Sequence, residues 1–515
     1  MRHCSARTAD VPGVLRALLR SGRLCGSLTG AAPASYSIAA LAADVQRQAA
    51  QKTAMVFDLD ALRNNFSDCL RSFPSHFVHA LAIKSAPMTF MVDEALAAGL
   101  GIEAASFGEA ASAVERGCSP AKLYFDSPAK TVTELRWALE LGVSINADSL
   151  EELARIDAVL AERGPSRPST STIGLRINPI IDGGSIGIFA VSSSPDGKFG
   201  HPLHSHEARA AVRRAFDMYP WLSGLHAHVG SAGTSLPMLA SGAATLVELA
   251  HDIDAQCRRG GGTPRVTTLD IGGGLATNMA TDDVSPTFEE YSRVLSAAAP
   301  SLFTHTHRTV VTEFGRALTS KAGWIVTQVE YAKEPMRDHS ASGAAAGANV
   351  PAEETTRTAI CHAGADMMLR ACYRPDLYTH RISTYDAHGK PLASRRGRTV
   401  TTHLAGPLCF AGDYFQKDVM LPTLEAGDFV VVHDAGANTL ALWSRHCSRV
   451  RPPVYTYERP PAEGDEVQVA TQLEAEPLRN VLEFWGAPPP SSVEAQRHAA
   501  PPGHRPPEAS PPYVL

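Results

Sequence analysis

Several short apolar runs in this 515-residue chain end in residues that can do chemistry. The run VHALAIK ends in Lys84, whose ammonium can lose its charge by desolvation and become a nucleophilic amine. The run VTTLDIG leads into Gly272, Gly273 and Gly274, whose backbone N–H groups can cradle a phosphate. Other runs end in Arg176, Asn178, His228, Ser231, Glu313 and Arg316. Each feature also occurs in ordinary folds, but the combination indicates an amine nucleophile beside an anion-binding turn.

These residues belong to a repeating pattern between Val78 and Phe314. Eight apolar runs alternate with stretches of helical periodicity such as LEELARIDAVLAERG. The runs cover residues 78–84, 100–106, 122–127, 143–149, 172–179, 222–230, 266–272 and 309–315. This count and length predict a (β/α)8 barrel, whose active site forms at the C-terminal ends of its strands. A doubly wound open sheet would show the same alternation.

Beyond Gly323 the pattern changes to short β-branched pieces separated by turns, such as DFVVVHDAGA. We therefore expect a barrel over residues 55–322 and a β domain over residues 323–460. Residues 461–515 are predicted to be a Pro-rich tail that does not pack.

The composition narrows the classes of function. A net charge of −6 gives no reason to expect nucleic acid as a partner, and no apolar run reaches the length of a membrane helix. The nine cysteines stand singly, which is typical of reduced, intracellular thiols. Residues 1–40 are rich in arginine and carry a single acid, which fits either an organelle transit peptide or a disordered tail. We therefore expect an intracellular protein, in a chloroplast or other organelle, or otherwise in the cytoplasm.

From about Val56 to Tyr457 the chain resembles the fold-type III pyridoxal-phosphate (PLP) decarboxylases, which include diaminopimelate, ornithine and arginine decarboxylases. The resemblance is carried by ALAIKSAP (80–87), RINP (176–179), KFG (198–200), LHAHVGS (225–231), DIGGGL (270–275), EFGR (313–316) and GPLCFAGD (406–413). Of these motifs, RINP, KFG and GPLC are closest to the diaminopimelate branch. The resemblance implies an alanine-racemase-like barrel and a C-terminal β-sandwich or β-barrel domain. It also implies that a strand from before the barrel, at about residues 41–55, joins the β domain.

The resemblance assigns roles to the residues at the strand ends. It makes Lys84 the Schiff-base lysine, His228 the imidazole stacked on the cofactor ring and Glu313 the carboxylate at the ring nitrogen. The phosphate would be held by Ser231, the amides of Gly272, Gly273 and Gly274, and Arg316. Asn438 also contacts the cofactor, at a position where the family has a tyrosine.

The β domain supplies the remaining expected site residues. The resemblance makes Cys409 a catalytic group that reaches the active site of a partner subunit, which implies a homodimer with shared sites. Arg316, Arg370, Phe410 and Asp413 would contact the substrate. The tyrosine that accompanies Arg370 is either Tyr373 or Tyr378, because the motif RPDLY (374–378) also fits by spacing.

Phe410 is the main departure from diaminopimelate decarboxylases, which usually carry a glutamate there that contacts the distal amino group of the substrate. A phenylalanine cannot accept that hydrogen bond. The resemblance therefore predicts a decarboxylase that converts meso-diaminopimelate to L-lysine and CO2. The alternatives are decarboxylation of another amino acid, ornithine-like, arginine-like or less polar, and a catalytically silent PLP-binding paralogue.

Overall fold

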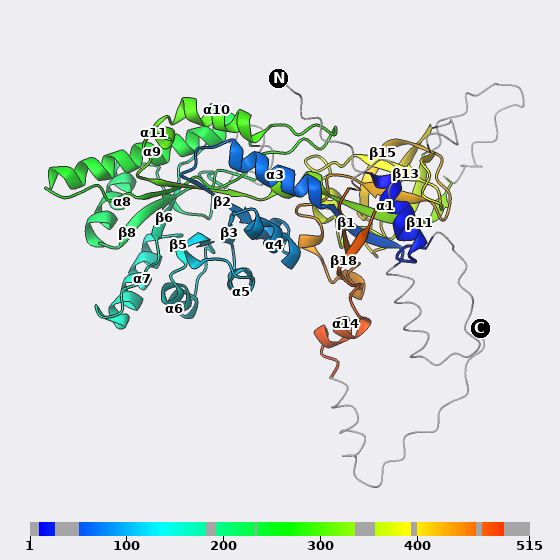
Figure 1. Ribbon diagram of the computed structural model, residues 1–515, viewed down its shortest axis with the longest axis horizontal. Helices are drawn as coiled ribbons and strands as arrows, with labels where there is room; N and C mark the ends of the chain where they lie inside the picture. The colour runs from blue at the N-terminus through cyan, green and yellow to red at the C-terminus, as the bar shows by residue number, and fades with distance from the viewer. Residues whose placement is uncertain are drawn as a thin grey trace, which may run out of the picture.

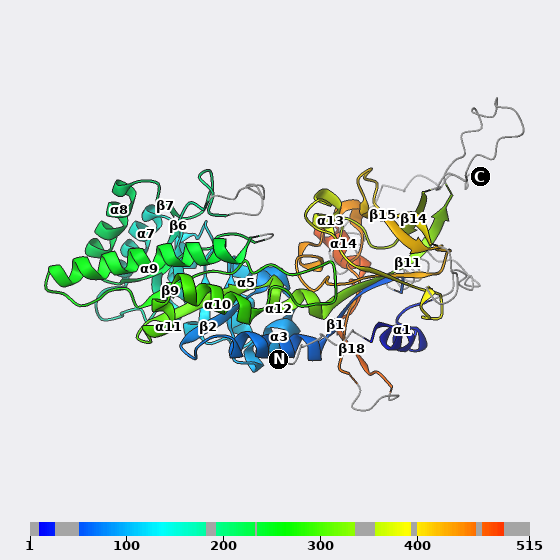
Figure 2. The same cartoon turned by 90° about the horizontal axis from the view of Figure 1, so that it is seen from above.

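The computed structural model describes residues 10–25, 51–181, 192–231, 234–334, 356–392, 399–459 and 466–488. Figures 1 and 2 show two lobes side by side, a barrel lobe in blue to green and a β lobe that includes the yellow and orange segments. No helix in this part of the chain is long and apolar enough to cross a membrane.

The first lobe is a closed parallel barrel of eight strands, in which β5 also pairs with β6 and so joins the two ends of the strand order. The barrel strands are β2 (Phe77–Ala82), β3 (Gly101–Ala104), β4 (Leu123–Phe125), β5 (Ser144–Ala147), β6 (Ile173–Asn178), β8 (Leu222–His226), β9 (Thr268–Asp270) and β10 (Thr309–Phe314). Each falls on one of the eight apolar runs, which confirms the barrel prediction and excludes the open sheet. A two-residue strand, β7 (His201–Pro202), pairs with β6 beside the barrel.

Helices follow the strands and cover the barrel from outside. They are α4 (Thr89–Ala97), α5 (Phe107–Glu115), α6 (Val132–Leu141), α7 (Leu150–Arg163), α8 (His206–Met218), α9 (Leu236–Arg259), α10 (Phe288–Ala298), α11 (Ser301–Thr304) and α12 (Arg316–Thr319). Local sequence signals begin several of them: Thr131 with Glu134 and Thr287 with Glu290 form capping boxes at α6 and α10.

The second lobe is built on a nine-stranded mixed sheet centred on a long strand, β11 (Gly323–Lys333). The first half of β11 lies between β1 and β16, and its second half pairs with β12. The other strands are β1 (Thr53–Asp58), β12 (Arg357–Cys361), β13 (Ile382–Tyr385), β14 (Thr399–Ala405), β15 (Tyr414–Pro422), β16 (Phe429–Val432), β17 (Val454–Tyr457) and β18 (Val469–Leu473). The lobe also carries the short helix α13 (Leu369–Tyr373).

The chain enters the barrel through the β domain. As the resemblance implied, a strand from before the barrel joins this domain; it is β1 (Thr53–Asp58), which overlaps the end of the expected stretch at residues 53–55. Asp58 ends β1 and caps α3 (Leu59–Arg71) by accepting a hydrogen bond from the Ala61 N–H at 2.8 Å. The same carboxylate accepts from the hydroxyl of Tyr457 at 3.1 Å, which ties the start of the barrel lobe to β17.

At both chain ends, some of the described residues that were expected to be unstructured form ordered elements. Helix α1 (Val11–Arg20) is ordered, because Val11, Val14, Leu15 and Leu18 form one apolar face that packs on the β domain. Near the other end, β18 pairs with β17 and is followed by α14 (Leu478–Phe484), so residues 466–488 are not a tail. The rest of residues 1–40 and the Pro-rich residues 489–515 lie outside the described residues.

The packing of α1 can be tested directly. Leu15 is fully buried in the cluster that α1 shares with the sheet, so Leu15→Ala is expected to lower the free energy of unfolding by about 2–5 kcal/mol. Arg16 on the exposed face of the same helix is the matched control, and Arg16→Ala should stay within about 0.5 kcal/mol of wild type. Urea denaturation measures both. Equal values would mean that α1 does not stabilise the β domain.

Candidate active site

A cavity of about 280 Å³ lies at the C-terminal ends of the barrel strands. The barrel contributes Lys84, His228, Ser231, Gly274, Glu313 and Arg316 to its lining, and the β domain contributes Arg370 and Asn438. Most of the strand-end residues singled out in the sequence therefore meet in one place, at the junction of the two lobes, whereas Asn178 does not line the cavity.

Lys84 follows β2 in a short 3-10 turn, Ile83–Ser85, and its side chain is 45% exposed to the cavity. Its Nζ donates to Glu103 Oε2 at 2.5 Å. Burial would lower the pKa of this lysine, but the carboxylates of Glu103, Glu313 and Asp126 outweigh burial and raise it. In the cavity without cofactor, desolvation by the apolar strand is therefore outweighed, because the neighbouring barrel strands bring acids to Lys84.

His228 stands across the cavity as a neutral imidazole. Its Nδ1 accepts a hydrogen bond from the Gly273 N–H at 3.1 Å, so any proton on the neutral ring is on Nε2. Burial, with the nearby charges of Lys84 and Arg176, holds the pKa of His228 well below its ordinary value. A neutral, fixed ring of this kind is suited to stacking on a planar ligand.

Glu313 lies on the cavity floor, where its side chain is 1% exposed. Its Oε2 is 3.9 Å from His228 Nδ1, and its Oε1 has no hydrogen-bond partner among the described residues. Burial raises the pKa of Glu313 well above its ordinary value, and the carboxylates of Asp126 and Asp270 raise it further. Glu313 therefore holds a proton in this state and can give it to a basic atom in the cavity.

An anion-binding corner is formed by Ser231, Gly274 and Arg316. Arg316 is buried with its Nη2 unpartnered within the described chain, and burial next to Arg370 lowers its pKa to about 10. Gly274 has φ +97°, and a Cβ there would lie 2.0 Å from the Gly230 carbonyl oxygen, so only glycine fits this turn. An unsatisfied buried guanidinium beside a tight glycine turn fits a phosphate group.

The three glycines do not act alike, which corrects the sequence prediction. The Gly272 N–H donates to Asp270 Oδ1 at 3.0 Å, and the Gly273 N–H donates to His228. Both amides are therefore occupied by the protein, and of the three glycines only Gly274 lines the cavity. The roles of Gly272 and Gly273 are to shape the turn and to orient His228.

The tyrosine that accompanies Arg370 is Tyr378. The Tyr378 ring lies between two guanidiniums, with the Cζ atoms of Arg316 and Arg370 each 5.4 Å from its centroid. The Arg370 Nη1 also donates to the Tyr378 hydroxyl at 3.4 Å. Tyr373, by contrast, is 58% exposed and stacks on Phe410, with their ring centroids 5.1 Å apart.

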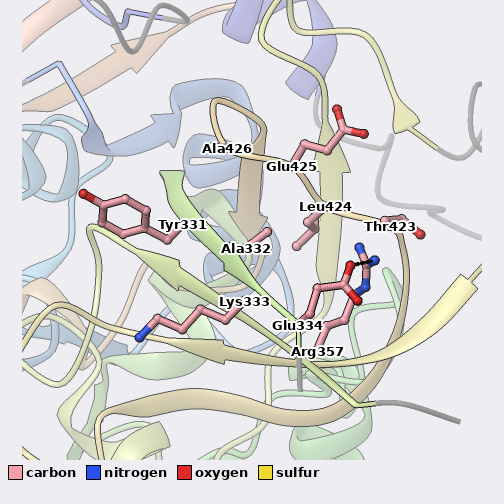
Figure 3. Close-up of a pocket in the computed structure, with 9 residues that line it drawn as sticks. All are labelled: Tyr331, Ala332, Lys333, Glu334, Arg357, Thr423, Leu424, Glu425 and Ala426. Carbon is pink, nitrogen blue, oxygen red and sulfur yellow. Dashed lines mark hydrogen bonds and ion pairs between the residues drawn. The ribbon is translucent and has the colours of Figure 1, made fainter. Parts of the chain in front are cut away.

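A second, larger hollow of about 620 Å³ lies on the β domain, away from the strand ends of the barrel. Figure 3 shows its lining, in which the charged side chains of Glu334 and Arg357 are paired with each other. None of the strand-end residues of the barrel lines this hollow, and we place the chemistry in the smaller cavity.

The comparisons with known proteins agree with this cavity. The family model of the pyridoxal-dependent decarboxylase, pyridoxal binding domain, matches residues 59–320, about half of the chain. The chain belongs to this decarboxylase family. Its cofactor is pyridoxal 5′-phosphate, and the lysine, acid and buried arginine described above fit that group.

Individual relatives share most of the chain. The diaminopimelate decarboxylase of Pseudomonas aeruginosa is 29% identical over 395 residues, 76% of this chain and 84% of its own length. A probable chloroplastic diaminopimelate decarboxylase of Oryza sativa is 26% identical over 388 residues, 75% of this chain and 70% of its own. The solved structure of diaminopimelate decarboxylase from Helicobacter pylori with L-lysine superposes with a TM-score of 0.68, covering 84% of this chain and 97% of that one at 21% identity. That structure supports the fold.

Several predicted site residues of this decarboxylase do not line the cavity of their own chain, among them Cys409 and Asp413. Cys409 is exposed on a loop of the β domain and does not line the cavity. Asp413 is buried, and its carboxylate accepts from the N–H groups of Ala365 at 2.6 Å and Leu408 at 2.7 Å. Both carboxylate oxygens of Asp413 hold the loop that carries Cys409, and its contact with the substrate stays a prediction.

The sequence analysis missed three buried residues of the decarboxylase site: Glu103, Asp126 and His226. Glu103 lies within β3, Asp126 directly follows β4 and His226 ends β8. Each belongs to one of the apolar runs already assigned to the barrel. A polar residue inside an otherwise apolar strand was the available signal.

Proposed function

We propose that this protein decarboxylates meso-diaminopimelate to L-lysine and CO2. The convergence of Lys84, Glu313 and Arg316 on one cavity supports decarboxylation, and the names of the relatives support the substrate. When bound, pyridoxal phosphate accepts the electron pair that remains as CO2 leaves the substrate.

Each residue of the cavity has its own role in the proposed reaction. Ser231, Gly274 and Arg316 bind the phosphate, and Lys84 supplies the amine that holds the cofactor. Glu313 holds or gives a proton at the ring nitrogen. Arg370, fixed against Tyr378, offers a second guanidinium for a carboxylate of the substrate.

The site is completed, in our proposal, by a second copy of the chain. Cys409 and Tyr373 are exposed, Phe410 is half-buried where it stacks on Tyr373, and none of the three lines the cavity of its own chain. A partly exposed aromatic pair beside a thiol suits an interface in which each subunit completes the cavity of the other. The intracellular compartment inferred from the sequence stays a prediction.

Mixing two inactive variants tests the shared site. Lys84→Ala and Cys409→Ala are each expected to be inactive as homodimers. Their heterodimers contain one site with both residues intact, so mixing should restore up to about half of the activity per heterodimer, measured as CO2 release. A pair of Lys84→Ala and Glu313→Ala is the control, because two residues of one cavity cannot complement. No recovery after confirmed subunit exchange would place Cys409 in its own chain's site or outside catalysis.

The substrate is tested by loading the protein with cofactor and measuring CO2 from meso-diaminopimelate and a panel of L-amino acids. Phe410 cannot bind a distal ammonium, so we expect turnover of diaminopimelate with broad tolerance of other amino acids, differing by about 1–3 kcal/mol per methylene. Phe410→Glu should raise the preference for diaminopimelate, and Phe410→Gln is the uncharged control. Strict selectivity in the wild type would mean that another residue binds the distal amine. Binding of cofactor with no CO2 from any amino acid would overturn the proposed function.

A further inference from the structure

His226 lies beneath the cavity floor at the end of β8 and is fully buried. Its Nδ1 is 3.3 Å from Asp270 Oδ2 and 3.7 Å from Glu313 Oε1, and its Nε2 is 3.7 Å from Asp126 Oδ2. Neither ring nitrogen has a hydrogen-bond partner within the described residues. Burying an imidazole without a hydrogen-bond partner costs free energy, so its place among carboxylates calls for an explanation.

The two acids near Nδ1, Asp270 and Glu313, differ in the other hydrogen bonds that they accept. Asp270 already accepts from the Gly272 N–H and from Asn146 Nδ2, both at 3.0 Å. Glu313 Oε1 accepts from no described residue. A closure of a few tenths of an ångström would bring His226 Nδ1 within hydrogen-bond distance of Glu313 Oε1.

The charges around His226 come from nearly every strand of the barrel. They are Lys84 after β2, Glu103 on β3, Asp126 after β4, Arg176 on β6, His228 after β8, Asp270 on β9 and Glu313 on β10. The fixed cations have other carboxylates: Lys84 contacts Glu103, and Arg176 is 3.6 Å from Asp148. His226 Nδ1 lies 3.7 Å from Glu313 Oε1, and within the described residues neither atom has a hydrogen-bond partner.

We propose that His226 is a positioning residue that acts through Glu313 and fixes the proton between Glu313 and the cofactor's ring nitrogen. One proton passes from Glu313 to that nitrogen, and the negative charge left on Glu313 faces His226 Nδ1. Both ring nitrogens face carboxylates, Asp126 at Nε2 and Glu313 at Nδ1, so the ring can carry a proton on each, and its Nδ1–H can then donate towards Glu313. The inference rests on the family's cofactor and not on the proposed substrate.

The test observes the cofactor itself. The protein is loaded with ¹⁵N-labelled pyridoxal phosphate, and the ring-nitrogen resonance reports whether that nitrogen is protonated. His226→Asn is expected to move the resonance from the protonated towards the unprotonated position. It should also weaken cofactor binding by about 10- to 100-fold in equilibrium dialysis.

His79→Asn is the matched control. His79 is also a buried barrel histidine, but it is bonded to Thr312 Oγ1 at 2.8 Å, stacks near Phe73 and does not line the cavity. It should leave the resonance and the binding unchanged.

A second variant, His226→Gln, likewise removes the imidazole opposite Glu313 Oε1, so a displacement in the same direction is expected. It also serves if His226→Asn fails to fold. A wild-type resonance in the folded variants, or an equal displacement in His79→Asn, would overturn the proposal. Because no substrate is used, failure to decarboxylate diaminopimelate would leave this test intact.

Discussion

Lys84→Ala is expected to abolish turnover, with activity falling by at least about 10³-fold, as when other enzymes lose a covalent group. The side chain is the amine that lines the cavity opposite the anion-binding corner, and Glu103 holds its Nζ at 2.5 Å. The loss should also remove the visible absorbance of the bound cofactor. No other lysine lines this cavity among the described residues, so no substitute is at hand.

Borohydride reduction of the cofactor-loaded protein, followed by peptide mapping, identifies the attachment site. The pyridoxyl label should lie on Lys84 in the wild type and be absent from Lys84→Ala. Lys198 is the matched control, since it is an exposed lysine near the cavity whose Nζ lies 4.7 Å from the ring centroid of Phe199. Lys198→Ala should keep the label and most of the activity. A label on any residue other than Lys84 would refute the assignment.

The barrel could be predicted from the sequence because each buried parallel strand is a short apolar run that is followed by an amphipathic helix. The end of the chain that was mispredicted shows the limit of composition. Residues 1–40 are rich in arginine overall, yet Val11, Val14, Leu15 and Leu18 follow the helical spacing of a buried face. Periodicity within a ten-residue window was more informative there than the average over forty residues.

The site residues at the strand ends could be predicted from the sequence, because the C-terminal ends of the parallel strands lie together at one end of the barrel. They are Lys84, His228, Glu313 and Arg316. The sequence could not predict the charge on Lys84, since its raised pKa depends on acids that other strands place beside it. Those contacts join positions 19 residues apart or more, as in the pair of Lys84 and Glu103. The hydrogen bonds that Asp413 accepts from Ala365 and Leu408 could not be predicted for the same reason, because these partners are known only once the loop is folded.

Glu313→Gln is expected to lower kcat by about 10²- to 10⁴-fold while the cofactor stays attached to Lys84. The amide occupies the same space, but it has no acidic proton to give the ring nitrogen and cannot carry the negative charge that remains. The pyridoxyl label after borohydride reduction should therefore persist, in contrast to Lys84→Ala. Loss of the label in Glu313→Gln would mean that Glu313 is needed for attachment and not for the electron-accepting step.

The same substitution should stabilise the cofactor-free protein. Burial and the nearby carboxylates raise the pKa of Glu313 in the folded state, so folding takes up a proton above its ordinary pKa near 4.5. Stability contributed by this site is therefore lost as pH rises from about 4.5 towards the raised pKa. Glutamine removes that proton uptake, so Glu313→Gln should unfold at higher urea than wild type at pH 7 and show a flatter dependence on pH. Glu330→Gln, in the β domain where Glu330 pairs with His362 at 2.9 Å, is the matched control and should show no such gain, because its pKa is lowered in the folded state. Equal pH dependence of Glu313→Gln and wild type would show that Glu313 is not the buried acid that opposes folding.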